Sequence, residues 1–140
     1  MKSNNTNKSI AKRFVEEIIN TGNTNNIAEF ISENYIDHND RSGSVTGIEG
    51  AISHIQGVRS TYPDLQVSIE QQICDADLVV SRIIGRATHK GEWLGIKATH
   101  KPIEIHGVNI DRIKDNKIIE HWGMANSLEA LIEIGAFPVK

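Results

Sequence analysis

The spacing of apolar residues changes its period at Pro63, and this change most constrains the fold. Across residues 46–62 an apolar side chain recurs about every third or fourth position, which is the period of an amphipathic helix. The run "TGIE" at its start predicts a capping box, with Thr46 as N-cap and Glu49 three residues later. Over residues 65–73 apolar and polar residues alternate instead, which predicts a half-buried strand.

Further helices are predicted on both sides of this point. Helical periodicity over residues 10–19 is followed by Gly22, a helix stop signal, and a second short helix is predicted around residues 27–31. A last helix is predicted over residues 127–134. Residues 1–8 are polar and bury too little apolar surface to offset the entropy of ordering, so we expect a disordered or frayed tail.

The predicted strands follow the first three helices without interruption. After residues 65–73 come "LVVSRIIGRATH" (78–89), a glycine-containing loop with Trp93, and two strands within residues 103–124. Helices and strands that are segregated in this way indicate an α+β fold, with helices on one face of an antiparallel sheet. We expect residues 9–140 to form a single domain.

Composition narrows the function classes. The net charge of -3, from 15 basic and 18 acidic residues, argues against a nucleic-acid or membrane-surface partner. The single Cys74 suits a reducing compartment, and the polar amino terminus predicts no signal peptide, so we expect a cytoplasmic protein. The six histidines have no HxxxH or HExxH spacing, so no metal is expected.

The two strands of "IEIHGVNIDRIKDNKIIEHWGM" (103–124) have two alternative registers, which depend on the turn between them. If only residues 115–116 form the turn, Asp111 lies opposite Glu120. His106 and Glu120 then point to opposite faces of the strand pair.

A three-residue turn at 114–116, with Asn116 in the left-handed position of a G1 bulge, instead places Ile110 opposite Glu120. We favour this register because the first one sets two carboxylates opposite each other, whereas the second brings Arg112 diagonally next to Glu120. Its mainly apolar face gathers His106, Val108, Ile110, Arg112, Ile118, Glu120, Trp122 and Met124. We expect that face to line an apolar pocket, with Glu120 and His106 at its two edges.

The runs "TYPDLQVSIE" (61–70) and "GRATHKGEWLGIKATHKPIEIHGVNIDRIKDNKIIEHWGM" (85–124), with the earlier "NYIDHND" and "GIEG", resemble the SnoaL-like polyketide cyclases, or predicted ester cyclases. These belong to the nuclear transport factor 2-like superfamily, and the resemblance covers about residues 10–136. No single motif is diagnostic, but their order and spacing together are specific. The resemblance implies an α+β cone around a deep apolar pocket, assembled as dimers or tetramers. It also implies cyclisation of a polyketide ester by intramolecular aldol condensation, without metal or cofactor.

The resemblance also implies roles for individual residues. Glu120 stands where the family carries an aspartate that acts as general acid and base, and His106 matches the pocket histidine. Glutamate in place of aspartate is a departure from the family pattern. His38 resembles the histidine at the pocket mouth, although an Asx-type turn explains "DHND" equally well.

The other candidates come from strand parity and side-chain size. The further pocket candidates are Trp122, Ile110, Val108, Met124, Arg112, Arg82 and Trp93. Trp93 is expected on a loop lid, the orientations of Arg82 and Arg112 stay open, and His121 is expected to face away from the pocket. Two main hypotheses follow: a cofactor-independent cyclase or isomerase for a small apolar carbonyl compound, or a non-catalytic protein that binds a small apolar ligand. A purely structural dimerisation module is a weaker third reading.

Overall fold

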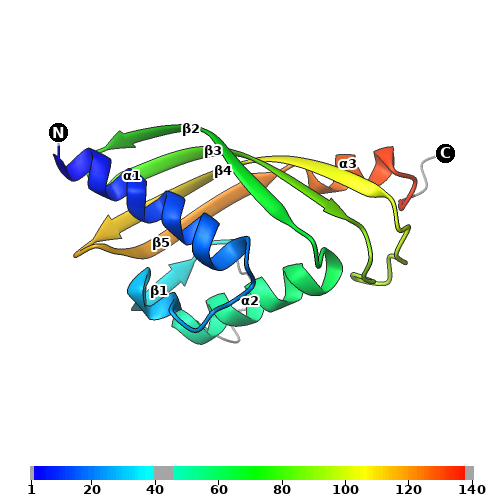
Figure 1. The fold of residues 1–140 in the computed structure, drawn as a ribbon, viewed down its shortest axis with the longest axis horizontal. Coiled ribbons are helices and arrows are strands. Elements are labelled where there is room, and N and C mark those ends of the chain that lie inside the picture. The colour runs from blue at the N-terminus through cyan, green and yellow to red at the C-terminus, as the bar shows by residue number, and fades with distance from the viewer. Residues whose placement is uncertain (1, 40–45, 138–140) are drawn as a thin grey trace.

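The computed structural model describes residues 2–39 and 46–137 (Figure 1). Five strands form one sheet in the order β1-β5-β4-β3-β2, and all neighbours are antiparallel except the parallel pair β1 and β5. The strands are β1 (Ile31–Asp37), β2 (Gln66–Asp75), β3 (Leu78–Thr88), β4 (Pro102–Lys114) and β5 (Lys117–Ala125). The helices are α1 (Lys2–Phe14) with a π-helical continuation (Val15–Ile19), a 3-10 turn (Ile27–Glu29), α2 (Gly47–Thr61) and α3 (Ser127–Glu133). The predicted α+β class is confirmed.

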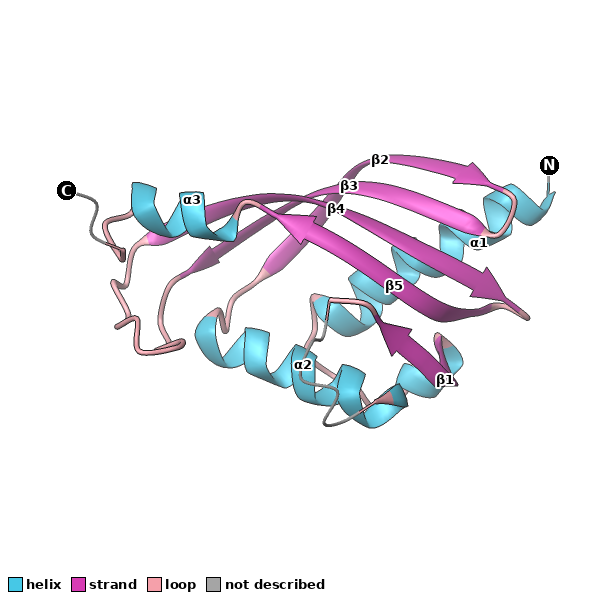
Figure 2. Cartoon of the chain, turned by 180° about the vertical axis from the view of Figure 1, so that it is seen from behind, coloured by secondary structure: helices cyan, strands magenta, loops and turns pink. Residues whose placement is uncertain are grey.

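The sheet is curved, and α1 and α2 both lie on the same side of it (Figures 1 and 2). We call the face that they cover the inner face, which carries Val79 and Ile113, and the opposite one the outer face, which carries Val108 and Trp122. Beneath α1 the inner face is filled by a packed core of Ile10, Ala11, Ile18, Ile27, Phe30, Ile31, Tyr35, Ala51, Ile55, Val79, Ile113 and Ile118. The outer face has no helix over it in either view. The homo-oligomer implied by the resemblance stays a prediction.

Two expectations about the N-terminal region are wrong. Helix α1 begins at Lys2, so the segment expected to be a frayed tail is helical from its second residue. Strand β2 holds α1 through contacts that local composition does not reveal. The Gln72 side chain donates to the Lys8 carbonyl over 3.1 Å, and the Cys74 thiol donates to Asn4 Oδ1 over 3.7 Å.

The second short helix is a single 3-10 turn followed by strand β1. Ile31 and Tyr35, whose spacing also suits a helix, are both buried from this strand. The segment is extended because it pairs with β5, far along the chain, and the Ile118 N–H donates to the Phe30 carbonyl over 2.7 Å. Tertiary pairing therefore overrides the local pattern.

The favoured register of the β4–β5 hairpin is also wrong. Asp115 and Asn116 have φ of 51° and 62°, which is typical of a two-residue type I′ turn. A β-bulge follows, because Ile113 lies opposite Ile118 whereas Arg112 lies opposite Glu120. The bulge avoids the pair of facing carboxylates and also turns Ile118 into the core, where it is 1% exposed. The hairpin therefore has the two-residue turn of the first predicted register and the proximity of Arg112 to Glu120 expected from the second.

Candidate functional site

An open cavity of about 570 Å³ lies between the inner face of the sheet and α2, beyond the packed core. Its walls are mostly apolar, with Val58, Tyr62, Leu65, Val67, Ile83 and Ile105 among them. Four glycines also line it: Gly57 of α2, and Gly85, Gly107 and Gly123 of β3, β4 and β5. No lysine, arginine, aspartate or glutamate of the described residues lines this cavity.

His121 and Asp111 form a hydrogen-bonded pair on the inner face. They lie opposite each other on β5 and β4, and the His121 Nδ1 atom is 2.7 Å from Asp111 Oδ1. Asp111 is buried, whereas His121 lines the cavity. Because an ionised carboxylate only accepts hydrogen bonds, Nδ1 carries the proton, and Nε2 of the neutral ring keeps its lone pair. This arrangement gives a base that is fixed by a carboxylate behind it.

The surroundings of His121 act on its pKa in opposite directions. Desolvation, the largest single influence, lowers the pKa, while the hydrogen bond and charge of Asp111 and the charge of Asp37 raise it. The net result is a pKa above the ordinary value of 6.5. The ring therefore holds its proton to a higher pH than an ordinary histidine does.

The free nitrogen of His121 lies beside Gly123 and Asn109. A Cβ atom added to Gly123 would lie 3.1 Å from His121 Nε2 and 3.1 Å from Asn109 Oδ1. Because Gly123 has no side chain, the space next to both atoms stays open. Both atoms therefore border the same open space above Gly123.

The end of β1 holds this part of β5 in place. The His38 N–H donates to the His121 carbonyl over 2.9 Å. The Asn39 side-chain amide donates to the Gly123 carbonyl and accepts from the Gly123 N–H, so it pairs with Gly123 as a neighbouring strand would. The Asn39 N–H also donates to Asp37 Oδ1 over 2.9 Å, so the Asx-type turn expected in "DHND" is present at its described residues; Asp40 lies outside them.

Glu120 belongs to a different network, on the outer face. Its carboxylate oxygens contact His38 Nε2 at 2.8 Å and accept from Arg112 Nε at 3.1 Å. Arg112 also bonds both carboxylate oxygens of Asp77, and the His38 ring stacks on Trp122 with centroids 4.4 Å apart. Glu120, His38, Arg112 and Trp122 do not line the cavity.

The remaining predicted site residues lie partly on the outer face and partly at the cavity. His106 is exposed on the outer face and contacts Glu104 through Nε2 at 3.1 Å. Arg82, Val108 and Ile110 share that face, so they too lie away from the cavity. Of the predicted pocket residues, Met124 and Trp93 do line it.

Strand parity therefore separated the two faces of β4 and β5 correctly, but this cavity lies on the face opposite to the one that was favoured. The expectation that His121 faces away from the pocket is wrong. The missed residues are Asn109, Asp111, His121 and Gly123. In the sequence, these polar residues and the glycine alternate with mainly apolar residues on two paired strands. The alternation separates the side chains into two faces but does not say which face α1 and α2 cover.

Trp93 sits in the β3–β4 loop, which is fixed at its base and exposed at its tip. At the base, His89 is fully buried and its Nδ1 accepts from the Thr99 N–H over 3.3 Å. At the tip, Trp93 and Ile96 bond each other around a tight turn, and Leu94 between them is largely exposed. The lid function of this loop stays a prediction.

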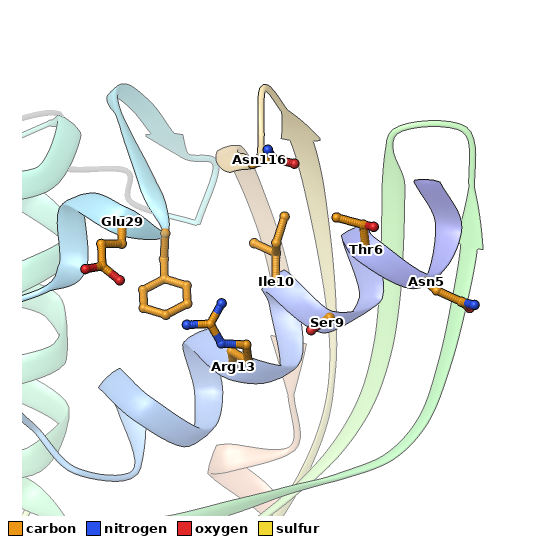
Figure 3. Close-up of a pocket in the computed structure, with 8 residues that line it drawn as sticks. Asn5, Thr6, Ser9, Ile10, Arg13, Glu29 and Asn116 are labelled. Carbon is orange, nitrogen blue, oxygen red and sulfur yellow. The ribbon is translucent and has the colours of Figure 1, made fainter. Parts of the chain in front are cut away.

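A second hollow, of about 530 Å³, lies between α1, the 3-10 turn and the β4–β5 turn (Figure 3). The polar residues of its lining include Asn5, Ser9, Glu29 and Asn116. Arg13 also lines it, but this guanidinium is already bonded to Glu17 at 2.7 Å.

Two further observations concern the described ranges 2–39 and 46–137 only. No helix there is long and apolar enough to cross a membrane. No three histidine, cysteine, aspartate or glutamate side chains there gather in a metal-binding arrangement.

Comparison with known proteins places the chain in a family. The model of the SnoaL-like polyketide cyclases matches residues 9–134. Among solved structures, the chain is similar to IdmH from Streptomyces antibioticus, a proposed polyketide cyclase, with 25% identity, a TM-score of 0.80 and coverage of 92% of this chain and 98% of that one. It is also similar to a proposed polyketide cyclase from Acidithiobacillus ferrooxidans, with 25% identity, a TM-score of 0.83 and coverage of 93% of this chain and 94% of that one. A third similar structure is AclR from Streptomyces galilaeus, a proposed hydroxylase, with 26% identity, a TM-score of 0.79 and coverage of 94% of this chain and 97% of that one. Among curated proteins, none matches the chain.

Proposed function

Because the chain belongs to the SnoaL-like polyketide cyclase family, we propose that it is an enzyme that cyclises or isomerises a carbonyl compound, with His121 as general base. The observation that carries this proposal is the His121–Asp111 pair, whose free nitrogen faces an apolar cavity. A histidine oriented by a carboxylate and open to a ligand on its other side is a common arrangement for proton transfer.

The cavity lining favours a neutral substrate. Its walls are mostly apolar, and no described lysine, arginine, aspartate or glutamate lines it. An ionised carboxylate or phosphate would lose its hydration there, which is costly, and pairing with a protonated His121 would leave no free base for the reaction. A ketone or an ester has no such cost, and its carbonyl group makes the neighbouring C–H acidic enough for a histidine base.

The reaction follows from the position of the proton on His121. Nε2 takes a proton from the carbon next to the substrate carbonyl: the C–H bond breaks, the N–H bond forms, and the electron pair moves onto the carbonyl oxygen. The enolate carbon then attacks a second carbonyl carbon of the same molecule and forms the new C–C bond. The resulting alkoxide takes the proton back from Nε2. Asp111 stabilises the intermediate imidazolium through its bond to Nδ1.

This proposal moves the acid–base role away from the residues that the resemblance indicated. Both carboxylate oxygens of Glu120 already contact His38 and Arg112, on the outer face. A base there has no described cavity in front of it. Catalysis by Glu120 and His106 stays a prediction, which the variants below test against His121.

The test is exchange of the acidic C–H protons of 2-tetralone, a flat neutral ketone, with deuterium from D₂O, followed by NMR. We expect the wild type to accelerate exchange above the buffer rate and His121→Gln to lower the enzymatic rate by about 10²–10⁴-fold. His106→Gln makes the same chemical change on the outer face and is the matched control, which we expect to exchange as the wild type does.

Two results would contradict the proposal. One is a wild-type rate equal to that of buffer, and the other is a His121→Gln variant that keeps the wild-type rate. If the wild type binds 2-naphthol, a flat aromatic analogue of the enol of 2-tetralone, but does not accelerate exchange, the non-catalytic ligand-binding function is favoured instead.

A further inference from the structure

We infer that the Asn109 side chain binds the carbonyl oxygen of the substrate and stabilises the enolate oxygen while His121 removes the proton. This inference rests on the proposed function of the same site. It assigns a second role in the cavity, that of hydrogen-bond donor to the developing negative charge.

The position of Asn109 suits this role. It lies opposite Gly123 in the β4–β5 register, next to the facing pair of Asp111 and His121. Asn109 Oδ1 and His121 Nε2 both lie 3.1 Å from the point that a Gly123 Cβ atom would occupy. Oδ1 is an acceptor, so the amide donates to a bound carbonyl oxygen after a half-turn about its Cβ–Cγ bond, which brings Nδ2 to the place of Oδ1. A planar carbonyl group that lies over Gly123 with its acidic C–H toward Nε2 then has its oxygen on the Asn109 side.

The amide of Asn109 is also free to bind a ligand. Among the described residues its side chain takes part in no hydrogen bond, although it lines the cavity and is half-buried. The other asparagine of the cavity, Asn39, is fully engaged by the backbone of Gly123. A half-buried amide without protein partners carries a desolvation cost, which a bound carbonyl oxygen offsets.

A neutral amide suits the chemistry better than a charged donor. Its N–H strengthens the hydrogen bond as charge moves onto the substrate oxygen, yet it does not compete with His121 for the proton. In acyl-transfer enzymes, one such fixed donor accounts for about 10²–10³-fold in rate. The cavity has a mostly apolar lining, so little water competes for the same oxygen.

The test uses Asn109→Leu, which keeps similar volume but loses the amide, with two readouts. We expect exchange of 2-tetralone to fall by about 10²-fold and the dissociation constant of 2-naphthol, measured by its fluorescence, to rise about tenfold. The pH at which the exchange rate is half-maximal should stay at the wild-type value, because the His121–Asp111 pair is intact. Asn109→Ser, a smaller polar replacement, should give the same direction of change if Asn109→Leu does not fold.

The matched control is Asn34→Leu, the same replacement at an exposed asparagine of β1 that does not line the cavity, and we expect wild-type values from it. If Asn109→Leu keeps both the exchange rate and the 2-naphthol affinity while His121→Gln loses exchange, the inference is overturned and the proposed function stands. If His121→Gln leaves exchange unaffected, the proposed function fails, and the effect of Asn109→Leu on 2-naphthol affinity still decides whether Asn109 binds the ligand oxygen.

Discussion

Two adjacent residues of β5, Glu120 and His121, each form a carboxylate–histidine pair, but on opposite faces of the sheet. The two contacts have nearly the same length, 2.8 Å for His38–Glu120 and 2.7 Å for His121–Asp111. Their surroundings differ. The outer pair has side-chain exposures of 36% and 27%, whereas those of the inner pair are 23% and 11%.

The difference shows that a short distance between an acid and a base does not identify a catalytic pair. On the outer face Glu120 is shared between His38 and Arg112, and the His38 ring is stacked on Trp122, so both groups are already engaged. Such a half-exposed network contributes modestly to stability. On the inner face, one nitrogen of His121 is bonded and the other is open to the cavity.

The largest expected difference in exchange rate is between variants at the carboxylates of the two pairs. Asp111→Asn should lower the rate of 2-tetralone exchange by about 10²-fold, because an amide does not hold the Nδ1 proton of His121 or stabilise the imidazolium as a carboxylate does. Glu120→Gln should leave the rate within about twofold of the wild type. Exchange kinetics of the two variants, measured side by side, check this, and a larger loss in Glu120→Gln would restore the role that the family resemblance assigns to Glu120.

A smaller effect is expected from filling the space in front of His121. Gly123→Ala should lower the exchange rate about tenfold, because the new methyl group lies 3.1 Å from both Nε2 and the Asn109 oxygen, where the substrate is expected. Gly57→Ala adds a methyl group to the α2 side of the same cavity with no atom within 4 Å of it, and should raise the free energy of unfolding by up to about 1 kcal/mol. Equal losses of rate in the two variants would indicate general crowding rather than a blocked base.

The smallest expected effect is on the pH dependence of stability. Because the folded-state pKa of His121 is raised above 6.5, the stabilisation from its pair with Asp111 is fully present below that pH and is lost as pH rises through the folded-state pKa. In Asp111→Asn the desolvation of the His121 ring, which lowers its pKa, is left without its main opposing charge. The pKa of His121 should then fall below 6.5, and its contribution to stability should increase rather than decrease as pH rises. Urea unfolding of both proteins at about pH 5.5 and about pH 8.5 measures it. The same pH dependence in both proteins would show that Asp111 does not control the proton on His121.

Much of the fold could be predicted from single-strand and single-helix patterns. The change of period at Pro63 correctly located the end of α2 and the start of β2, and the apolar runs located β3, β4 and β5. Strand β1 could not be found in this way, because Ile31 and Tyr35 fit a helical spacing and become a strand only through pairing with β5. A bulge was predicted at Asn116, whereas the observed one lies between Ile118 and Glu120. Its position was missed for a similar reason: the burial of Ile118 that it permits depends on the core beneath α1.

By itself the sequence determined the α+β class, the family resemblance and the separation of β4 and β5 into two sets of side chains, since these depend on local periodicity and motif order. Only the tertiary structure decided which set faces the cavity. Alternation along a strand places Glu120 and His121 on opposite faces but does not distinguish the two, and the distinction arises when α1 and α2 pack against one face. That packing leaves His121, Asn109 and Gly123 around an open space and Glu120 in a network on the uncovered side.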